Sequence, residues 1–329
     1  MSFSAATKNE ISKLPVDRDC CLIAELAAIV RMSGTIQISG MRKISLKFVT
    51  ENAAIARRIF VILKNLYNAN MEILVRKNRQ LKKNNNYMIV VKETHISRKI
   101  LKDVGLITDN KESNFLIDHR IPEDIVKNRC CKRAYIRGAF LGGGSISNPE
   151  KSYHLEFVTN NEEHSKALTD LINSFGLNAR IVTRKGNYVI YLKEGEQIVD
   201  VLNIIGAHQA LLKFENIRVV KDVRNNVNRL VNCETANLNK TINASIKQVE
   251  NIEFIDKTIG IEKLPENLQE LARLRLEHRD ASLKELGAMM TPPIGKSGVN
   301  YRFKKIEKIA KDLKRREKGG YDSEKSDNK

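Results

Sequence analysis

Tryptophan is absent from this chain of 329 residues, acidic residues are fewer than basic ones, and no apolar run in it could cross a membrane. Lys and Arg number 57 against 39 Asp and Glu, so the formal charge is +18. An excess of this size is typical of proteins that bind a polyanion, most often nucleic acid. A basic surface that serves only solubility is the alternative.

The longest apolar run, "CCLIAELAAIV", is interrupted by Glu25 and is too short for a bilayer. No N-terminal signal sequence is evident. We therefore expect a cytoplasmic, nucleoid-associated protein, with neither a membrane nor a small-molecule substrate as its partner.

Metal-binding cysteine spacings are also missing. No CxxC or Cys/His pattern accompanies the five cysteines, which are Cys20, Cys21, Cys130, Cys131 and Cys233. Adjacent cysteines point to different faces of a helix, so we expect buried, reduced thiols. No metal and no cofactor are predicted.

Hydrophobic residues make up 42% of the chain and charged residues 29%, which indicates a globular protein of two or three domains.

The sequence contains an internal repeat. Two cysteine pairs lie 110 residues apart, and "LKFVTENAAIA" from Leu46 matches "LEFVTNNEEHS" from Leu155. "YMIVVKETHISRKILKDVG" matches "YVIYLKEGEQIVDVLNIIG" in the same order, and three ordered matches indicate a duplication. The first copy has the longer hairpin turn, "RKNRQLKKNNN".

Each copy is predicted to run helix, strand, strand, helix, strand, strand, helix, because its strands alternate in polarity as in "KISLKFV". The fold class is therefore α+β, with two αββαββα halves, residues 1–110 and 111–221, that form a pseudo-symmetric saddle. Residues 1–221 hold 35 Lys/Arg and 22 Asp/Glu. A phosphate-tracking groove and a dispersed basic surface both remain open.

Small residues predict that the first helices of the two halves meet. Ala24 and Ala28 lie four apart, and Ala134, Gly138 and Gly142 have the same spacing in the second copy. Such a stripe lets two helix backbones approach closely. A locally weak helix end is the alternative for the glycines.

The stretch "YIRGAFLGGGSIS" resembles the LAGLIDADG motif of homing endonucleases, in which each of two helices ends in an acid that binds the catalytic metals. Aligned on the motif, these acid positions hold Ser33 and Gly143. Neither residue can hold a metal usefully or activate a water. We therefore expect no catalytic residue and no enzyme activity, and we assign no ligand role to Glu25.

The composition changes from Val223, where an Asn-rich segment is broadly helical and suggests a long helical linker. Residues 222–314 are predicted to combine this linker with a helix-turn-helix. "NLQELARLRLE" has one apolar face, Ser282 and Glu285 form a capping box for "SLKELGAMM", and Ser297 is placed to cap a last, basic helix. The tail, 315–329, is predicted to be disordered.

In this geometry the start of the last helix contacts base edges, and its lysines contact phosphates. Ser297, Asn300 and Arg302 have base-recognising side chains. A solvated helix of a small bundle is the alternative. The DNA-binding residues predicted within 281–314 are Ser282, Lys284, Lys296, Ser297, Asn300, Tyr301, Arg302, Lys304, Lys305, Lys308 and Lys311.

A degenerate LAGLIDADG saddle followed by this helix-turn-helix resembles the WhiA family. The similar stretches include "NRLVNCETANLNKTINASIKQVENI" and "ASLKELGAMMTPPIGKSGVNYRFKKIEKIA". The resemblance implies a non-cleaving regulator that binds double-stranded DNA, linked to cell division and chromosome segregation, or to sporulation in some lineages. It also implies a connection with a sigma factor. The alternative function is a protein scaffold whose saddle contacts RNA polymerase, the sigma factor or division proteins.

Overall fold

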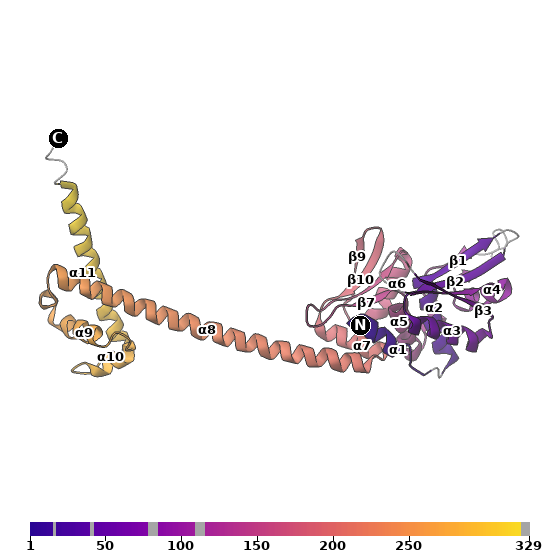
Figure 1. The fold of residues 1–329 in the computed structure, drawn as a ribbon, viewed down its shortest axis with the longest axis horizontal. Coiled ribbons are helices and arrows are strands. Elements are labelled where there is room, and N and C mark those ends of the chain that lie inside the picture. Colours follow the sequence, from indigo (N-terminus) through magenta and orange to yellow (C-terminus); the bar gives the residue numbers. More distant parts are fainter. Residues whose placement is uncertain (16–17, 40–42, 78–84, 109–115, 324–329) are drawn as a thin grey trace. The chain divides into compact units, whose positions relative to one another are not determined.

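The computed structural model describes residues 1–15, 18–39, 43–77, 85–108 and 116–323 (Figure 1). The chain divides into two compact units, Met1–Val223 and Arg224–Lys329. The first unit contains both sequence repeats, and the second contains the predicted helix-turn-helix. Most of the basic hairpin turn singled out in the sequence lies outside the described residues.

The two repeats have the predicted element order, and α1 (Phe3–Ile11) precedes them. The first consists of α2 (Asp19–Ser33), β1 (Gly34–Ser39), β2 (Lys43–Thr50), α3 (Ala53–Tyr67), β3 (Met71–Lys77), β4 (Asn85–Val91) and α4 (Thr94–Asp103). The second consists of α5 (Arg129–Gly143), β7 (Gly144–Ile146), β8 (Leu155–Thr159), α6 (Glu162–Asn173), β9 (Arg180–Arg184), β10 (Asn187–Leu192) and α7 (Gly195–Ile205). The short strands β5 (Ile107–Thr108) and β6 (Leu116–Ile117) and the 3-10 turn η2 (Glu123–Val126) lie between them.

Both repeats form the same antiparallel sheet. The strand orders are β1-β2-β4-β3 and β7-β8-β10-β9. In β2 the side chains of Ile44, Leu46 and Phe48 are buried, and polar residues alternate with them, because successive side chains point to opposite faces of a strand. Asn52 and Asn161 begin the following helices, where each side chain accepts a backbone N–H. The predicted α+β architecture is confirmed.

The first helices of the repeats, α2 and α5, pack against each other at the centre of this unit. Ala24, Ala28 and Ala134 are fully buried. A Cβ built on Gly138 would lie 2.2 Å from the carbonyl oxygen of Glu25, and one on Gly142 would lie 2.6 Å from the Cβ of Met32. The small residues therefore serve close packing, as predicted, and Gly138 is not a weak helix end.

A buried ion cluster crosses this helix pair. Glu25 of α2 is fully buried, and its Oε1 lies 2.8 Å from Nε of Arg58 on α3. Its Oε2 lies 3.0 Å from Nε of Arg137 on α5. Arg58 also donates to the carbonyl of Leu14. The acid that interrupts the apolar run thus joins the two repeats.

The second unit is helical. The 51-residue helix α8 (His208–Thr258) begins in the first unit, and η3 (Ile261–Lys263), α9 (Glu266–Glu277), α10 (Leu283–Met289) and α11 (Lys296–Ser323) follow. Apolar side chains from the end of α8 and from all later helices share one core. Val227, Leu230 and Leu238 in the middle of α8 are more than half exposed. Among the described residues, no helix is long and apolar enough to span a membrane.

The last helix differs from the prediction at its end. It continues through Ser323, so the segment 315–323 is helical and the predicted disordered tail is wrong there. Lys314, directly before this segment, donates to the side chain of Asn251 on α8. Residues 324–329 lie outside the described part of the chain.

Gly138→Ala is expected to lower the free energy of unfolding of the Met1–Val223 unit by about 1–2 kcal/mol. The new methyl group collides with a backbone oxygen that cannot rotate away, and this overpacking exceeds the gain of about 1 kcal/mol in helix propensity. Urea unfolding of the full chain, followed by circular dichroism, measures the change. Gly298→Ala is the matched control, because its Cβ would meet nothing closer than 3.5 Å and should be neutral or stabilising.

Arg58→Met is expected to destabilise the same unit by about 3–5 kcal/mol, because it leaves a buried carboxylate with one partner fewer. Adding Glu25→Gln removes the uncompensated charge, so the double variant should be more stable than Arg58→Met alone. Thermal unfolding of both variants provides the comparison. Equal stability would show that the charge of Glu25 is not what makes the loss costly.

Candidate functional site

Helix α10 begins with the predicted capping box. The Ser282 hydroxyl accepts the N–H of Glu285 at 3.3 Å, and the Glu285 carboxylate accepts the N–H of Ser282 at 2.7 Å. These bonds to Ser282 lower the pKa of Glu285. Ser282 therefore starts α10. Lys284, in the first turn of α10, is exposed.

The turn between α10 and α11 is held against α10 by close backbone contact. Ile294 donates its N–H to the carbonyl of Gly287 at 2.9 Å. A Cβ on Gly287 would lie 2.2 Å from the carbonyl oxygen of Ile294, so only glycine fits. Thr291 also donates its N–H to the Glu270 side chain of α9. The angle at which α11 leaves this turn thus depends on both preceding helices.

The start of α11 differs from the prediction. The helix begins at Lys296, and the carbonyl of Gly295 accepts the N–H groups of Gly298 and Val299. The residue whose carbonyl receives these first bonds is the N-cap, so the prediction that Ser297 caps the helix is wrong. Ser297 instead lies in the first helical turn, and its side chain is exposed.

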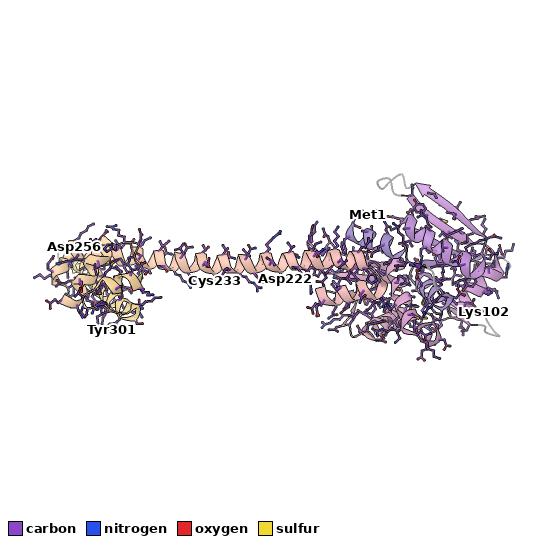
Figure 2. All side chains as sticks on the ribbon, turned by 90° about the horizontal axis from the view of Figure 1, so that it is seen from below. Met1, Lys102, Asp222, Cys233, Asp256 and Tyr301 are labelled. Carbon is purple, nitrogen blue, oxygen red and sulfur yellow. The ribbon has the colours of Figure 1, made fainter. Side chains whose placement is uncertain are left out.

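One face of α11 is buried and the opposite face is basic and exposed. Val299, Phe303, Ile306 and Ala310 pack in the core. Because each residue advances by about 100° around the helix, the exposed residues form a single stripe. This stripe contains the predicted residues Ser297, Asn300, Tyr301, Lys304, Lys305, Lys308 and Lys311, and the exposed Asp312 lies among them. Seven of the predicted DNA-binding residues therefore lie on one face of α11. Figure 2 labels one of them, Tyr301.

Within this stripe some side chains already have partners. The Lys305 ammonium lies 4.7 Å from the centre of the Tyr301 ring. Lys311 pairs with Glu307 at 3.0 Å, and Lys247 of α8 contacts the same carboxylate. Lys304 and Lys308 are exposed, without such a contact among the described residues.

Arg302 does not belong to the stripe. It is half-buried at the edge of the apolar face, and its guanidinium donates to the sulfur of Met290 at 3.6 Å. Arg302 was predicted together with Asn300 because both residue types recognise bases. Two positions along a helix correspond to a rotation of about 200°, so the two side chains point to different faces of α11. Its contact with guanine stays a prediction that needs the side chain to leave Met290.

Sequence reasoning missed Arg275. Its side chain is 2% exposed, and it donates to the carbonyls of His278, Arg279 and Ala281. Its guanidinium also lies over the Phe303 ring of α11 at 5.3 Å. Burial lowers the pKa of this guanidinium. Arg275 thus fixes the α9–α10 connection to α11, and no sequence pattern distinguishes it from the surface arginines.

Ser33 and Gly143, predicted to stand where the motif has its acids, are the last residues of α2 and α5. The Ser33 hydroxyl donates to the carbonyl of Ile29 in its own helix. A Cβ on Gly143 would lie 2.7 Å from the carbonyl oxygen of Val158 and 2.4 Å from Cε of Met32. An acidic side chain at position 143 would require movement of β8, so this end of α5 is built around glycine.

The solvent face of the first sheet is mixed in character. Val49, Met88 and Leu74 are direct neighbours across β2, β4 and β3, and Val49 and Leu74 are 44% and 42% exposed. Lys47 and Arg76 lie on the same face. The basic residues of this sheet are therefore interleaved with an apolar row.

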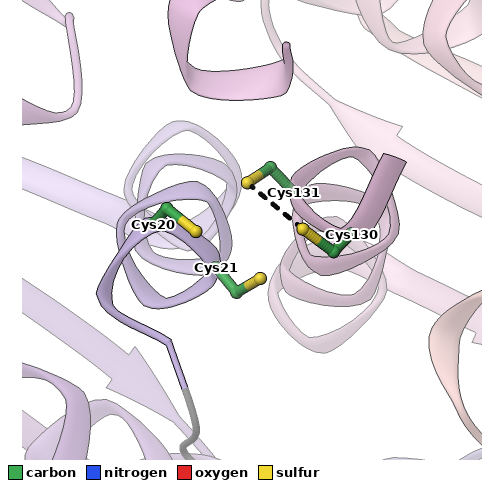
Figure 3. A group of neighbouring side chains, drawn as sticks. All are labelled: Cys20, Cys21, Cys130 and Cys131. Carbon is green, nitrogen blue, oxygen red and sulfur yellow. Dashed lines mark hydrogen bonds between the residues drawn. The ribbon is translucent and has the colours of Figure 1, made fainter. Parts of the chain in front are cut away.

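The cysteines differ most from the prediction. Cys20 is exposed, Cys21 and Cys130 are half-buried, and only Cys131 is buried, so the expectation of buried thiols is wrong for the other three. Their four Sγ atoms all lie within 4.8 Å of one another, between the amino ends of α2 and α5 (Figure 3). Burial raises the pKa of Cys131 to about 11, and a hydrogen bond from Cys21 lowers the pKa of Cys130. The sequence could not bring together pairs 110 residues apart.

Comparison with known proteins assigns each part of the chain. Residues 19–107 match the WhiA N-terminal LAGLIDADG-like domain, residues 132–224 the WhiA LAGLIDADG-like domain, and residues 227–310 the WhiA C-terminal HTH domain. Together these ranges cover both repeats and the helix-turn-helix.

Similar proteins extend over almost the whole chain. A "Probable cell division protein WhiA" of Alkaliphilus metalliredigens is 59% identical over 94% of this chain and 98% of its own length. One of Clostridium botulinum is 55% identical over 95% and 99%. The crystal structure of full-length DUF199/WhiA from Thermatoga maritima covers 94% of this chain and 98% of its own, at 27% identity and a TM-score of 0.58. The chain therefore belongs to the WhiA family of cell division proteins, with a degenerate LAGLIDADG fold and a helix-turn-helix domain.

Proposed function

We propose that this protein binds double-stranded DNA through the exposed stripe of α11 and regulates transcription during cell division and chromosome segregation, without cutting DNA. The stripe on α11 is the observation that carries this proposal. It places Ser297 and Asn300 at the amino end of the helix, where base edges are reached, and Lys304 and Lys308 further along, where phosphates are reached. From residue 296 to 318 there are ten Lys/Arg against three Asp/Glu.

The absence of cleavage is supported by the ends of α2 and α5. Phosphodiester hydrolysis at such a site needs divalent cations held by carboxylates. Ser33 and Gly143 occupy the two acid positions, and the only acid deep in the helix pair, Glu25, is bound by two arginines. The saddle then serves as a surface and not as a catalytic centre.

A second function is favoured by the first sheet. The apolar row of Val49, Met88 and Leu74 suits contact with a protein better than contact with phosphates. We propose that this face binds a protein partner, for which a sigma factor or another part of the transcription machinery is the candidate. This scaffold role is compatible with DNA binding by α11.

Asn300→Ala is expected to weaken binding to a cognate duplex by about 1–3 kcal/mol and to relax preference at one base pair, because Asn can pair with adenine. Lys308→Ala should weaken binding equally on all sequences and lower the salt dependence by about one phosphate contact. Fluorescence anisotropy on duplexes recovered by genome-wide mapping in the native host measures both.

Lys257→Ala is the matched control, since this exposed lysine lies on α8 and loses the same charge. Its affinity should equal that of the unchanged protein. If Asn300→Ala weakened binding equally on all duplexes, Asn300 would contact a phosphate and not a base. Unchanged binding by both α11 variants would remove the basis of the DNA-binding proposal.

Purified full-length protein is expected to leave supercoiled plasmid intact in the presence of Mg²⁺ or Mn²⁺, because no carboxylate lies at position 33 or 143. Gel electrophoresis after prolonged incubation shows the outcome. Metal-dependent nicking that survives further purification would contradict a non-cleaving role.

A further inference from the structure

Four cysteine sulfurs meet where the two repeats join at the amino ends of α2 and α5. Cys20 and Cys21 are the second and third residues of α2, and Cys130 and Cys131 are the second and third residues of α5. Every pair of these sulfurs lies within 4.8 Å, and Cys130 Sγ and Cys131 Sγ are 3.9 Å apart. Figure 3 shows two sulfurs from each helix pointing into one space.

These distances are close to those of one tetrahedral metal site. With Zn–S bonds of about 2.3 Å, the sulfurs of a tetrahedron are about 3.8 Å apart. Rotation of the cysteine side chains can bring the two most widely separated sulfurs about 1 Å closer, which would give this spacing. Clusters of several irons contain bridging sulfides and need thiolates that are more widely separated.

The surroundings also favour bound thiolates. Four thiolates and one divalent cation carry a net charge of −2, and both helices present the positive ends of their dipoles to the sulfurs. Neither α2 nor α5 has a side chain that accepts its first backbone N–H groups, although Asp19 lies in the first turn of α2. Soft thiolate ligands in a closed set of four are typical of structural zinc.

We propose that Cys20, Cys21, Cys130 and Cys131 form a mononuclear zinc site that joins the two repeats. Each repeat supplies two ligands, so the site exists only when α2 and α5 are paired. It lies at the end of the helix pair opposite to Ser33 and Gly143, so it is a separate site from that of the missing catalytic acids. Zinc binding therefore stabilises the Met1–Val223 unit and is independent of DNA binding by α11.

Co²⁺ is the spectroscopic probe for this site. Full-length protein, freed of metal under reducing conditions, is titrated with Co²⁺ and then with Zn²⁺. One equivalent of Co²⁺ per chain should give the strong visible absorption of tetrahedral thiolate coordination, and one equivalent of Zn²⁺ should abolish it. Zinc should also raise the unfolding midpoint of the Met1–Val223 unit.

Cys21→Ser and Cys131→Ser should each lower Co²⁺ affinity at least tenfold, or roughly 1.4 kcal/mol. Cys233→Ser is the matched control, because Cys233 is exposed on α8 (Figure 2) and should leave stoichiometry and spectrum unchanged. Circular dichroism checks the fold of each variant. If a variant does not fold, release of zinc from the unchanged protein by a thiol-specific mercurial, monitored with a chromophoric chelator, provides the second measurement.

Two results would overturn the proposal. One is the absence of thiolate-coordinated Co²⁺ in folded protein whose five thiols are all shown to be reduced. The other is the finding, by mass spectrometry of protein prepared without oxygen, of disulfides between α2 and α5, since oxidised sulfurs cannot hold the metal. Loss of DNA binding would leave the zinc site unaffected.

Discussion

Contact between α2 and α5 is the constraint on which the first unit depends. Gly138 lies against the carbonyl of Glu25, so the two helix backbones approach more closely than side chains with a Cβ would allow. At this short distance the carboxylate of Glu25 reaches Arg137 of the other repeat while it is held by Arg58 of its own. Close packing thus makes the ion cluster possible, and a buried charge with two well-placed partners in turn specifies one register of the helices.

The same helix pair keeps its packing contacts apart from the positions that align with the acids of the LAGLIDADG motif. The contact at Gly138 and the Glu25 cluster lie in the middle of the helices, away from Ser33 and Gly143. At the carboxyl ends Ser33 is bonded within its helix and Gly143 lies against β8. At the opposite ends the cysteine cluster offers a place where metal binding would reinforce the pairing. The packing contacts, the cysteine cluster and the aligned acid positions therefore occupy different parts of one pair of helices.

In the second unit, the basic stripe of α11 depends on residues that never face it. Gly287 permits the turn to pack on α10, and Arg275 joins the α9–α10 connection to the ring of Phe303. These contacts fix how α11 presents Asn300 and Lys308. A helix presents its side chains at fixed positions only when its own packing is held in this way.

The sequence by itself determined the element order of both repeats, the glycine contact between their first helices, the capping box at Ser282 and the buried face of α11. These features follow from local periodicity and spacing, which act over a few residues. Only the tertiary structure decided that Arg302 leaves the exposed stripe, that Arg275 and Arg58 are buried, and that α11 extends beyond residue 314. It also decided that four cysteines meet, because contacts between residues far apart depend on how the helices pack, and no local pattern records that.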